Sequence, residues 1–218
     1  MEWLSWIPNL GIRCFAQAGA ITSLIQWKLK ENVHTNATIG VYSGGTFDIL
    51  NPRSEDVRIE DIAHALSQQC RFTGHTRSFY SVAQHSILVS QICDPADALW
   101  GLLHDSSEAY MGDMNRPLKH TPEMSRFRTA EKAALFAITT HFGLDPKEPA
   151  SVKAADRRLV VSEARDLLPG SHSEGWEDFQ DVTPLPFEII PMEPRDAEAR
   201  FLDRFEELTG TRVMATYK

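Results

Sequence analysis

The sequence predicts an all-α fold, a helical bundle with a small β-hairpin near residues 38–50, and three observations support this prediction. From residue 57 onward, apolar residues recur at the three- and four-residue intervals of amphipathic helices. Proline or glycine follows most of these segments and marks their ends. Two β-rich runs flank Gly44–Gly45, the pattern of a two-residue hairpin turn. Because a lone hairpin is marginally stable in water, we expect it to pack on the helices.

The helices of the main body are expected at regular intervals along the chain. They are predicted over residues 57–70, 81–93, 96–112, 122–142, 146–167 and 195–208. Between them we expect a polar loop at 71–75, a turn at 115–117 and an irregular tract at 171–194, which is rich in glycine, proline and acidic residues. Gly112 and Gly143 each stop a helix.

Residues 1–36 are predicted to form an N-terminal helical appendage to the domain at residues 37–218. Pro8 and Gly11 interrupt its first part, whereas residues 15–31 have the composition of an amphipathic helix. We expect this helix to pack on the body or on a neighbouring subunit. The alternative, a membrane-surface helix, has only two lysines in its favour.

Composition and charge exclude several classes of function. The net charge of -8, from 22 basic and 30 acidic residues, argues against binding to a nucleic-acid polymer, although it permits a small anionic substrate. The sequence has no apolar run of about 18 residues and no basic segment before its first apolar patches, so we expect neither a membrane span nor a signal peptide. The 3 cysteines form no CxxC pair, which fits a reducing cytosol, and we expect a cytoplasmic location.

Imidazoles and carboxylates stand among apolar residues in the central part of the sequence. His85 lies in one predicted helix, and the adjacent pair His104 and Asp105 lies in the next. A further ligand is expected on a separate downstream helix, where Asp156 is the best candidate and Glu163, about two turns later, is the competitor. Buried groups of these kinds need compensation, which a divalent metal ion supplies. The sequence therefore predicts one metal site formed by His85, His104, Asp105 and Asp156.

Two nitrogen and two oxygen ligands suit Mn²⁺, Co²⁺, Fe²⁺, Ni²⁺ or Mg²⁺, with Zn²⁺ as a further option. Each residue taken singly also fits a simpler interpretation, either a hydrogen-bonded core histidine or a helix-surface acid. The His104–Asp105 adjacency, the glutamate at position 108 and the isolated Asp156 on an apolar helix together favour the metal site. We expect one divalent metal ion as cofactor.

Other charged residues are candidates for catalysis and substrate binding. Glu108 follows His104 by four residues and therefore shares its helix face, beside the ligands but not needed among them. This position suits a general base or acid. Arg71 offers a bidentate fork to a phosphate group, and His75 and Lys119 add positive charge. The alternative for Arg71 and Lys119 is an ordinary solvated surface charge.

The motifs SVAQH, LLHDSSE and AADRR resemble those of the HD-domain metal-dependent phosphohydrolase superfamily. The resemblance spans roughly residues 38–208 and is strongest to the small bacterial and phage hydrolases similar to deoxynucleoside 5'-monophosphatases. It implies an HD-type helical domain at residues 37–218. In this superfamily a histidine, a His-Asp doublet and a later aspartate hold the metal, which matches the four ligands predicted above.

The resemblance also implies roles for further residues. Within HDSSEAYMGDMNRPLK the family's catalytic glutamate falls on Glu108 and its second acid on Asp113. Arg71 and Phe72 match the family's arginine and aromatic residue for the phosphate and sugar, with Phe72 where a tryptophan often stands. Two features depart from the family pattern: the spacing from the first histidine to the doublet is short, and residues 1–36 have no counterpart.

The expected function is metal-dependent hydrolysis of a nucleotide, namely a (deoxy)nucleoside 5'-monophosphate. The alternatives among enzymes are a deoxynucleoside triphosphate triphosphohydrolase, a guanosine-tetraphosphate hydrolase and a cyclic-nucleotide phosphodiesterase, because all of them use the same ligand set. An alternative of another class is a non-catalytic nucleotide or metal sensor. The apolar N-terminal segment suggests self-association, so we expect a homodimer or a larger homo-oligomer.

Overall fold

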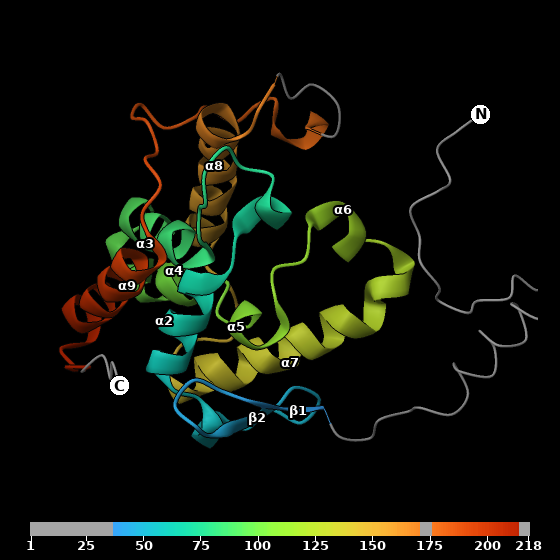
Figure 1. Cartoon of the computed structure of the whole chain (residues 1–218), viewed down its shortest axis with the longest axis vertical. Coiled ribbons are helices and arrows are strands. Elements are labelled where there is room, and N and C mark those ends of the chain that lie inside the picture. The colour runs from blue at the N-terminus through green and yellow to red at the C-terminus, as the bar shows by residue number, and fades with distance from the viewer. Residues whose placement is uncertain (1–36, 171–175, 214–218) are drawn as a thin grey trace, which may run out of the picture. The chain divides into compact units, whose positions relative to one another are not determined.

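The computed structural model describes residues 37–170 and 176–213, and Figure 1 shows how their helices are arranged. The fold is all-α with a small β-hairpin, as predicted. The helices are α2 (Ile59–Gln68), α3 (Val82–Ile92), α4 (Ala98–Leu103), α5 (Glu108–Met111), α6 (Arg116–Lys119), α7 (Ser125–His141), α8 (Ala150–Leu167) and α9 (Pro194–Thr209). The 3₁₀ turns are η1 (Ser54–Asp56), η2 (Arg71–Gly74), η3 (Pro95–Asp97), η4 (Pro122–Met124) and η5 (Glu177–Phe179). The predicted appendage at residues 1–36 lies outside the described residues.

The hairpin pairs β1 (Thr38–Gly40) with β2 (Thr46–Asp48) in antiparallel register. The loop between the strands has five residues, so the two-residue turn predicted at Gly44–Gly45 is wrong. The backbone N–H and the hydroxyl of Ser43 donate to the two carboxylate oxygens of Asp61, at 2.6 Å and 3.0 Å. Because Asp61 is buried on α2, these bonds hold the longer loop on the helical body.

The helix predicted over residues 96–112 is interrupted, which corrects the sequence interpretation. α4 ends at Leu103, and α5 begins only after a series of turns. The hydroxyl of Ser106 donates to the Leu103 carbonyl at 2.5 Å, and His104 Nδ1 lies 2.8 Å from the carbonyl three residues earlier. Such side-chain bonds compete with continuation of the helix. His104 and Asp105 lie in the turns that follow α4, with His104 Nε2 3.2 Å from Asp105 Oδ2.

α3 lies at the centre of the fold and packs against α2, α4, α8 and α9. Its Ile87 belongs to the core that contains residues of the hairpin, α2 and α9, whereas its Val89 belongs to the core that contains residues of α8. His85, one turn earlier on the same helix, has no exposed surface. The first predicted ligand is therefore carried by a helix that packs against four others.

The connection from α8 to α9 is irregular in its described part, as predicted for residues 171–194, apart from the turn η5. Arginines of α8 hold it in place: Arg165 donates to the carbonyls of Leu185 and Phe187, both at 2.7 Å. In the part of the chain that the structure describes, no helix combines the length and the apolar character needed to cross a membrane.

Candidate metal centre

Two buried imidazoles face each other through their Nε2 atoms. His85 on α3 and His104 at the end of α4 lie with these atoms 3.2 Å apart. The other nitrogen of each ring already has an acceptor: His85 Nδ1 lies 2.7 Å from Glu163 Oε1, and His104 Nδ1 lies 2.8 Å from the Gly101 carbonyl. An acceptor at Nδ1 places the proton there and leaves the Nε2 lone pair of each neutral ring directed at the other. Metal-binding histidines in proteins are oriented in this way.

Two aspartates border the same point. Asp105 Oδ2 lies 3.2 Å from His104 Nε2 and 3.6 Å from His85 Nε2. Asp156 Oδ1, from α8, lies 3.2 Å from His85 Nε2. One ligand atom from each of His85, His104 and Asp105 fits within a mutual distance of 4.8 Å. The structure thus groups His85, His104 and Asp105, and it places the fourth predicted ligand, Asp156, beside His85.

The negative charges of the acids in and behind this cluster favour a positive charge among them. Burial alone would lower the pKa of His85, but Glu163 and Asp156 outweigh it and raise the pKa to about 9. Burial likewise opposes the raised pKa of His104, which Asp105 causes. Burial would raise the pKa values of both aspartates, yet the neighbouring histidines hold these values below their usual range. A divalent cation supplies the same positive charge that the protons on the two rings would supply, so the donor set fits a metal ion.

Glu163 lies behind the cluster rather than in it. Its fully buried carboxylate accepts from Tyr80 Oη at 2.8 Å and from Arg71 Nη2 at 3.3 Å, besides its contact with His85 Nδ1. Burial would raise its pKa, but Arg71 and His85 lower it, so the group stays ionised. Of the two downstream acids, Asp156 therefore borders the Nε2 side of His85 and Glu163 orients the ring, a role that the sequence did not reveal.

Glu108 lies at the N-terminus of α5 and is almost fully buried. Its Oε2 atom has no hydrogen-bond partner among the described residues, and its Oε1 atom lies 3.7 Å from Lys119 Nζ. Burial and then the charges of Asp105 and Asp113 raise its pKa well above the usual range, against the effect of Lys119. Burial also raises the pKa of Asp113. A buried carboxyl with a raised pKa takes up a proton at a higher pH than an exposed one, which suits a general acid or base.

Two cations near the cluster, Arg71 and Lys119, form ion pairs with acids. The Arg71 guanidinium reaches Asp105 Oδ2 at 3.4 Å in addition to Glu163. Lys119 Nζ lies 2.5 Å from Glu131 Oε1, and this contact raises the lysine pKa although burial acts against it. Both side chains therefore stay positively charged beside the metal cluster.

The loop predicted at residues 71–75 is the turn η2, and its backbone is strained. Phe72 and Thr73 both have a φ of 53°, in the left-handed region, and Gly74 follows with a φ of 78°. A left-handed conformation costs a residue with a side chain about 1–3 kcal/mol. The turn aims Arg71 at the cluster, and Arg71 Cζ lies 5.6 Å from the centroid of the Phe72 ring.

A cavity of about 620 Å³ opens beside the cluster. Predicted residues that line it are Arg71, Phe72, Asp105, Glu108, Asp113, Lys119 and Asp156. His75, predicted to bind substrate, is not brought to this cavity: it is exposed at the end of η2. Trp176 and Phe179 also line the cavity, and no apolar periodicity marked them because they lie in the irregular tract. The volume is in the range of ligand-binding sites.

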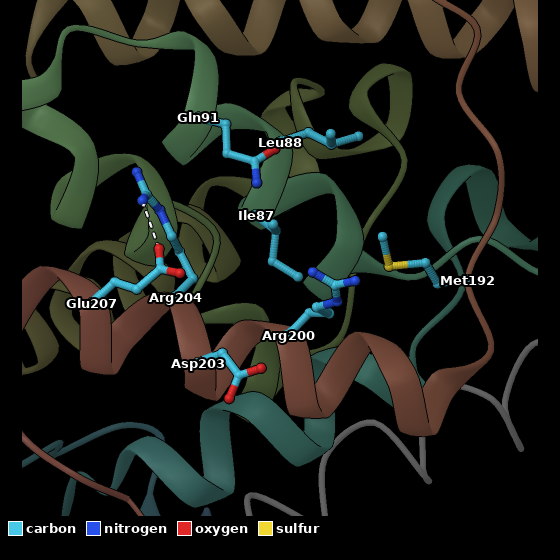
Figure 2. Close-up of a pocket in the computed structure, with 8 residues that line it drawn as sticks. All are labelled: Ile87, Leu88, Gln91, Met192, Arg200, Asp203, Arg204 and Glu207. Atoms are coloured by element: carbon cyan, nitrogen blue, oxygen red, sulfur yellow. Dashed lines mark hydrogen bonds and ion pairs between the residues drawn. The ribbon is translucent and has the colours of Figure 1, made fainter.

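A smaller hollow of about 110 Å³ lies between α3 and α9, and Figure 2 shows the side chains around it. At one end Arg204 and Glu207 form an ion pair of 3.0 Å, and Met192 lies at the other end. No predicted site residue lines this hollow. The larger cavity is therefore the candidate site.

Comparison with known proteins places this helical protein with its His/Asp cluster in a family. No family model matches the chain. The chain is 35% identical over 178 residues to the uncharacterized protein YfdR of Escherichia coli, a match that covers 81% of this chain and 98% of that protein. It is 33% identical over 156 residues to an uncharacterized protein of Rhodobacter capsulatus, covering 66% of this chain and 79% of that protein. The chain belongs to the family of YfdR.

Proposed function

We propose that this protein is a metal-dependent phosphohydrolase of the HD superfamily that hydrolyses a nucleotide, namely a (deoxy)nucleoside 5'-monophosphate. The observation that carries the proposal is the pair of buried Nε2 atoms 3.2 Å apart, with both Nδ1 atoms committed to acceptors. Beside this pair lie two ionised aspartates, and a cavity of nucleotide size opens next to it. A phosphate-ester substrate fits a site that joins metal ligands, cations and a protonatable carboxyl.

His85, His104, Asp105 and Asp156 would hold one divalent metal ion, namely Mn²⁺, Co²⁺, Fe²⁺, Ni²⁺, Mg²⁺ or Zn²⁺. When bound, such an ion supplies Lewis-acid chemistry, which makes phosphorus more electrophilic and water more acidic. The donor set alone does not select among these metals.

The protein's own groups handle the proton. Hydrolysis adds water to phosphorus and breaks the bond from phosphorus to the ester oxygen, which leaves with a proton. Glu108 Oε2, which has no partner among the described residues, is available to take the proton from the attacking water and to return it to the leaving oxygen. Its raised pKa brings it closer to the pH at which both steps run. Asp113, in the same cavity, would orient the water or the substrate.

Arg71 and Lys119 would neutralise phosphate charge. Both side chains line the cavity, and both remain charged because each forms an ion pair with an acid. A bound phosphate group would add a further negative charge beside each of them. An arginine fork suits the planar spacing of two phosphate oxygens. Phe72 lies beside Arg71 in the same cavity and would contact the sugar. His75 is given no role, because it is exposed and does not line the cavity.

A screen of nucleoside mono- and triphosphates against each candidate metal tests the proposal. We expect inorganic phosphate and the nucleoside from a monophosphate; release of triphosphate from a triphosphate would instead favour the triphosphohydrolase. Asp105→Asn is the matched control, because it removes a ligand with little change of shape. A screen without turnover for any pair would overturn the hydrolase and favour the sensor.

Two further properties belong to the proposal. We expect a homodimer or a larger homo-oligomer, which light scattering of the full chain would measure. A cytoplasmic location is supported by the thiols Cys70 and Cys93, which are free among the described residues.

A further inference from the structure

The cavity has two sides of different chemistry. One side carries the candidate metal ligands and Glu108. The other carries Trp176 and Phe179, from the connection between α8 and α9, together with Arg116 at the start of α6. Hydrolysis of a phosphate ester requires only the first side. The second side therefore indicates what else the substrate contains.

The aromatic side is held in place by guanidinium groups. The Phe179 ring lies 5.0 Å from Arg157 Cζ and 5.6 Å from Arg116 Cζ. Arg157 Nη2 also donates to the backbone carbonyl of Asp178 at 2.5 Å. Arg157 directly follows the candidate ligand Asp156 on α8, so one helix sets the positions of both sides of the cavity.

Trp176 extends this surface. Its ring lies 5.4 Å from the Phe179 ring at an angle of 50°, and both side chains are only partly buried. The resulting wall of Trp176, Phe179 and Arg116 lines the cavity with two aromatic rings and a planar cation. A planar heteroaromatic ring stacks on such a surface whatever its identity, and arginine adds both stacking and hydrogen-bond donors.

We propose that this aromatic wall, Trp176, Phe179 and Arg116, is a nucleobase-binding subsite. This inference rests on the proposed function, which places the phosphate at the metal ligands. The base would then stack on the wall. A cavity of about 620 Å³ has room for both groups at once. The wall recognises the base chiefly by stacking, so it favours nucleotides over simple phosphate esters more strongly than one base over another.

The test compares substrates with and without a base in the full-length, metal-loaded protein. For Trp176→Ala we expect KM for deoxyadenosine 5'-monophosphate to rise about tenfold, with KM for deoxyribose 5-phosphate unchanged. Trp176→Phe keeps an aromatic face and should stay within about twofold of wild type. Phe136→Ala is the matched control, since Phe136 is an exposed aromatic residue on α7 that does not line this cavity. Thermal unfolding of each variant establishes that it is folded.

The outcomes separate this inference from the proposed function. If Trp176→Ala leaves nucleotide turnover unchanged, or reduces turnover of both substrates equally, the proposal of a nucleobase subsite is wrong. The proposed hydrolase activity would still stand. If no substrate is turned over, calorimetric binding of the same two compounds decides. If the wild-type protein binds the nucleotide and Trp176→Ala weakens this binding about tenfold, the proposed hydrolase activity is wrong and the nucleobase subsite is supported. Failure of the wild-type protein to bind the nucleotide would overturn the wall.

Discussion

The candidate metal cluster of His85, His104, Asp105 and Asp156 and the aromatic wall, two sides of one cavity, are built in opposite ways. The cluster takes its side chains from α3, α8 and the end of α4, and both imidazoles are fixed at Nδ1 by groups behind them. The wall takes its side chains from the 3₁₀ turn η5, from Trp176 directly before it and from the four-residue helix α6, and these side chains are at least partly exposed. A reactive centre must be held rigidly, whereas specificity is commonly carried by loops on a rigid scaffold. Substitutions should therefore affect the two sides differently.

The largest effect is expected at Glu108. In Glu108→Gln the side chain keeps its size but cannot take up a proton, and kcat should fall by about 10²–10⁴. Metal content, measured by elemental analysis, should stay at the wild-type level because Glu108 is not among the predicted ligands. If Glu108→Gln kept full turnover with metal bound, Glu108 would not be the general acid or base.

Glu163→Gln tests how far the cluster depends on the group behind it. Loss of the charge that orients His85 should weaken metal binding by about 10- to 100-fold. Glu198→Gln is the matched control, because Glu198 is also buried and also contacts a histidine, His64 at 3.2 Å, but does not line the cavity. Metal titration measures the metal affinity of both variants. Equal losses of metal affinity in the two variants would show that Glu163 has only a general structural role.

The pH dependence of stability should differ between the metal-free and metal-loaded proteins. In the metal-free fold the pKa of His85 is raised to about 9, above its value of about 6.5 in an unfolded chain. A raised folded-state pKa gives stability that is complete below about pH 6.5 and is lost as pH rises toward 9. Metal binding displaces that proton, so stabilisation by metal should grow over the same range.

Thermal unfolding between pH 6 and pH 9, with chelator or with added metal, measures this effect. A melting temperature of the metal-free protein that rises through this window would contradict the assigned role of His85.

The smallest effect is expected in the turn η2, whose Arg71 and Phe72 line the cavity. Thr73→Gly relieves a left-handed backbone at the cost of greater flexibility in the unfolded chain, so the free energy of unfolding should rise by about 0.5–1 kcal/mol. Thr73→Ala keeps the β-carbon and should give no such gain. Denaturant unfolding measures the free energy of unfolding of both variants. A lower free energy of unfolding in Thr73→Gly than in the wild-type protein would contradict backbone strain at Thr73.

The cluster could be anticipated from sequence because helical periodicity constrains it. His85 and Asp156 interrupt apolar helix faces, and the structure brings both to one point. The break after Leu103 could not be anticipated, because the helical pattern continues through it and only the hydroxyl of Ser106 and the His104 ring end the helix. Glu163 shares a face with Asp156, so spacing alone could not tell which acid lies on which side of the imidazole.

The wall could not be predicted for a different reason. Trp176 and Phe179 lie in a tract without apolar periodicity, where nothing local indicates which direction a side chain takes. The Phe179 ring contacts Arg157 and Arg116, which lie on other helices, and the Trp176 ring contacts Phe179. Contacts of this kind arise only once the helices have packed.

Glu163 has a consequence for how this site tolerates change. One carboxylate serves Tyr80, His85 and Arg71 together, so none of the three contacts is independent of the others. Effects of substitutions at Tyr80 and Arg71 on metal affinity should therefore fail to add in a double-mutant cycle. The four positions form a single mutational unit: a replacement at one of them alters which residues the other three can accept.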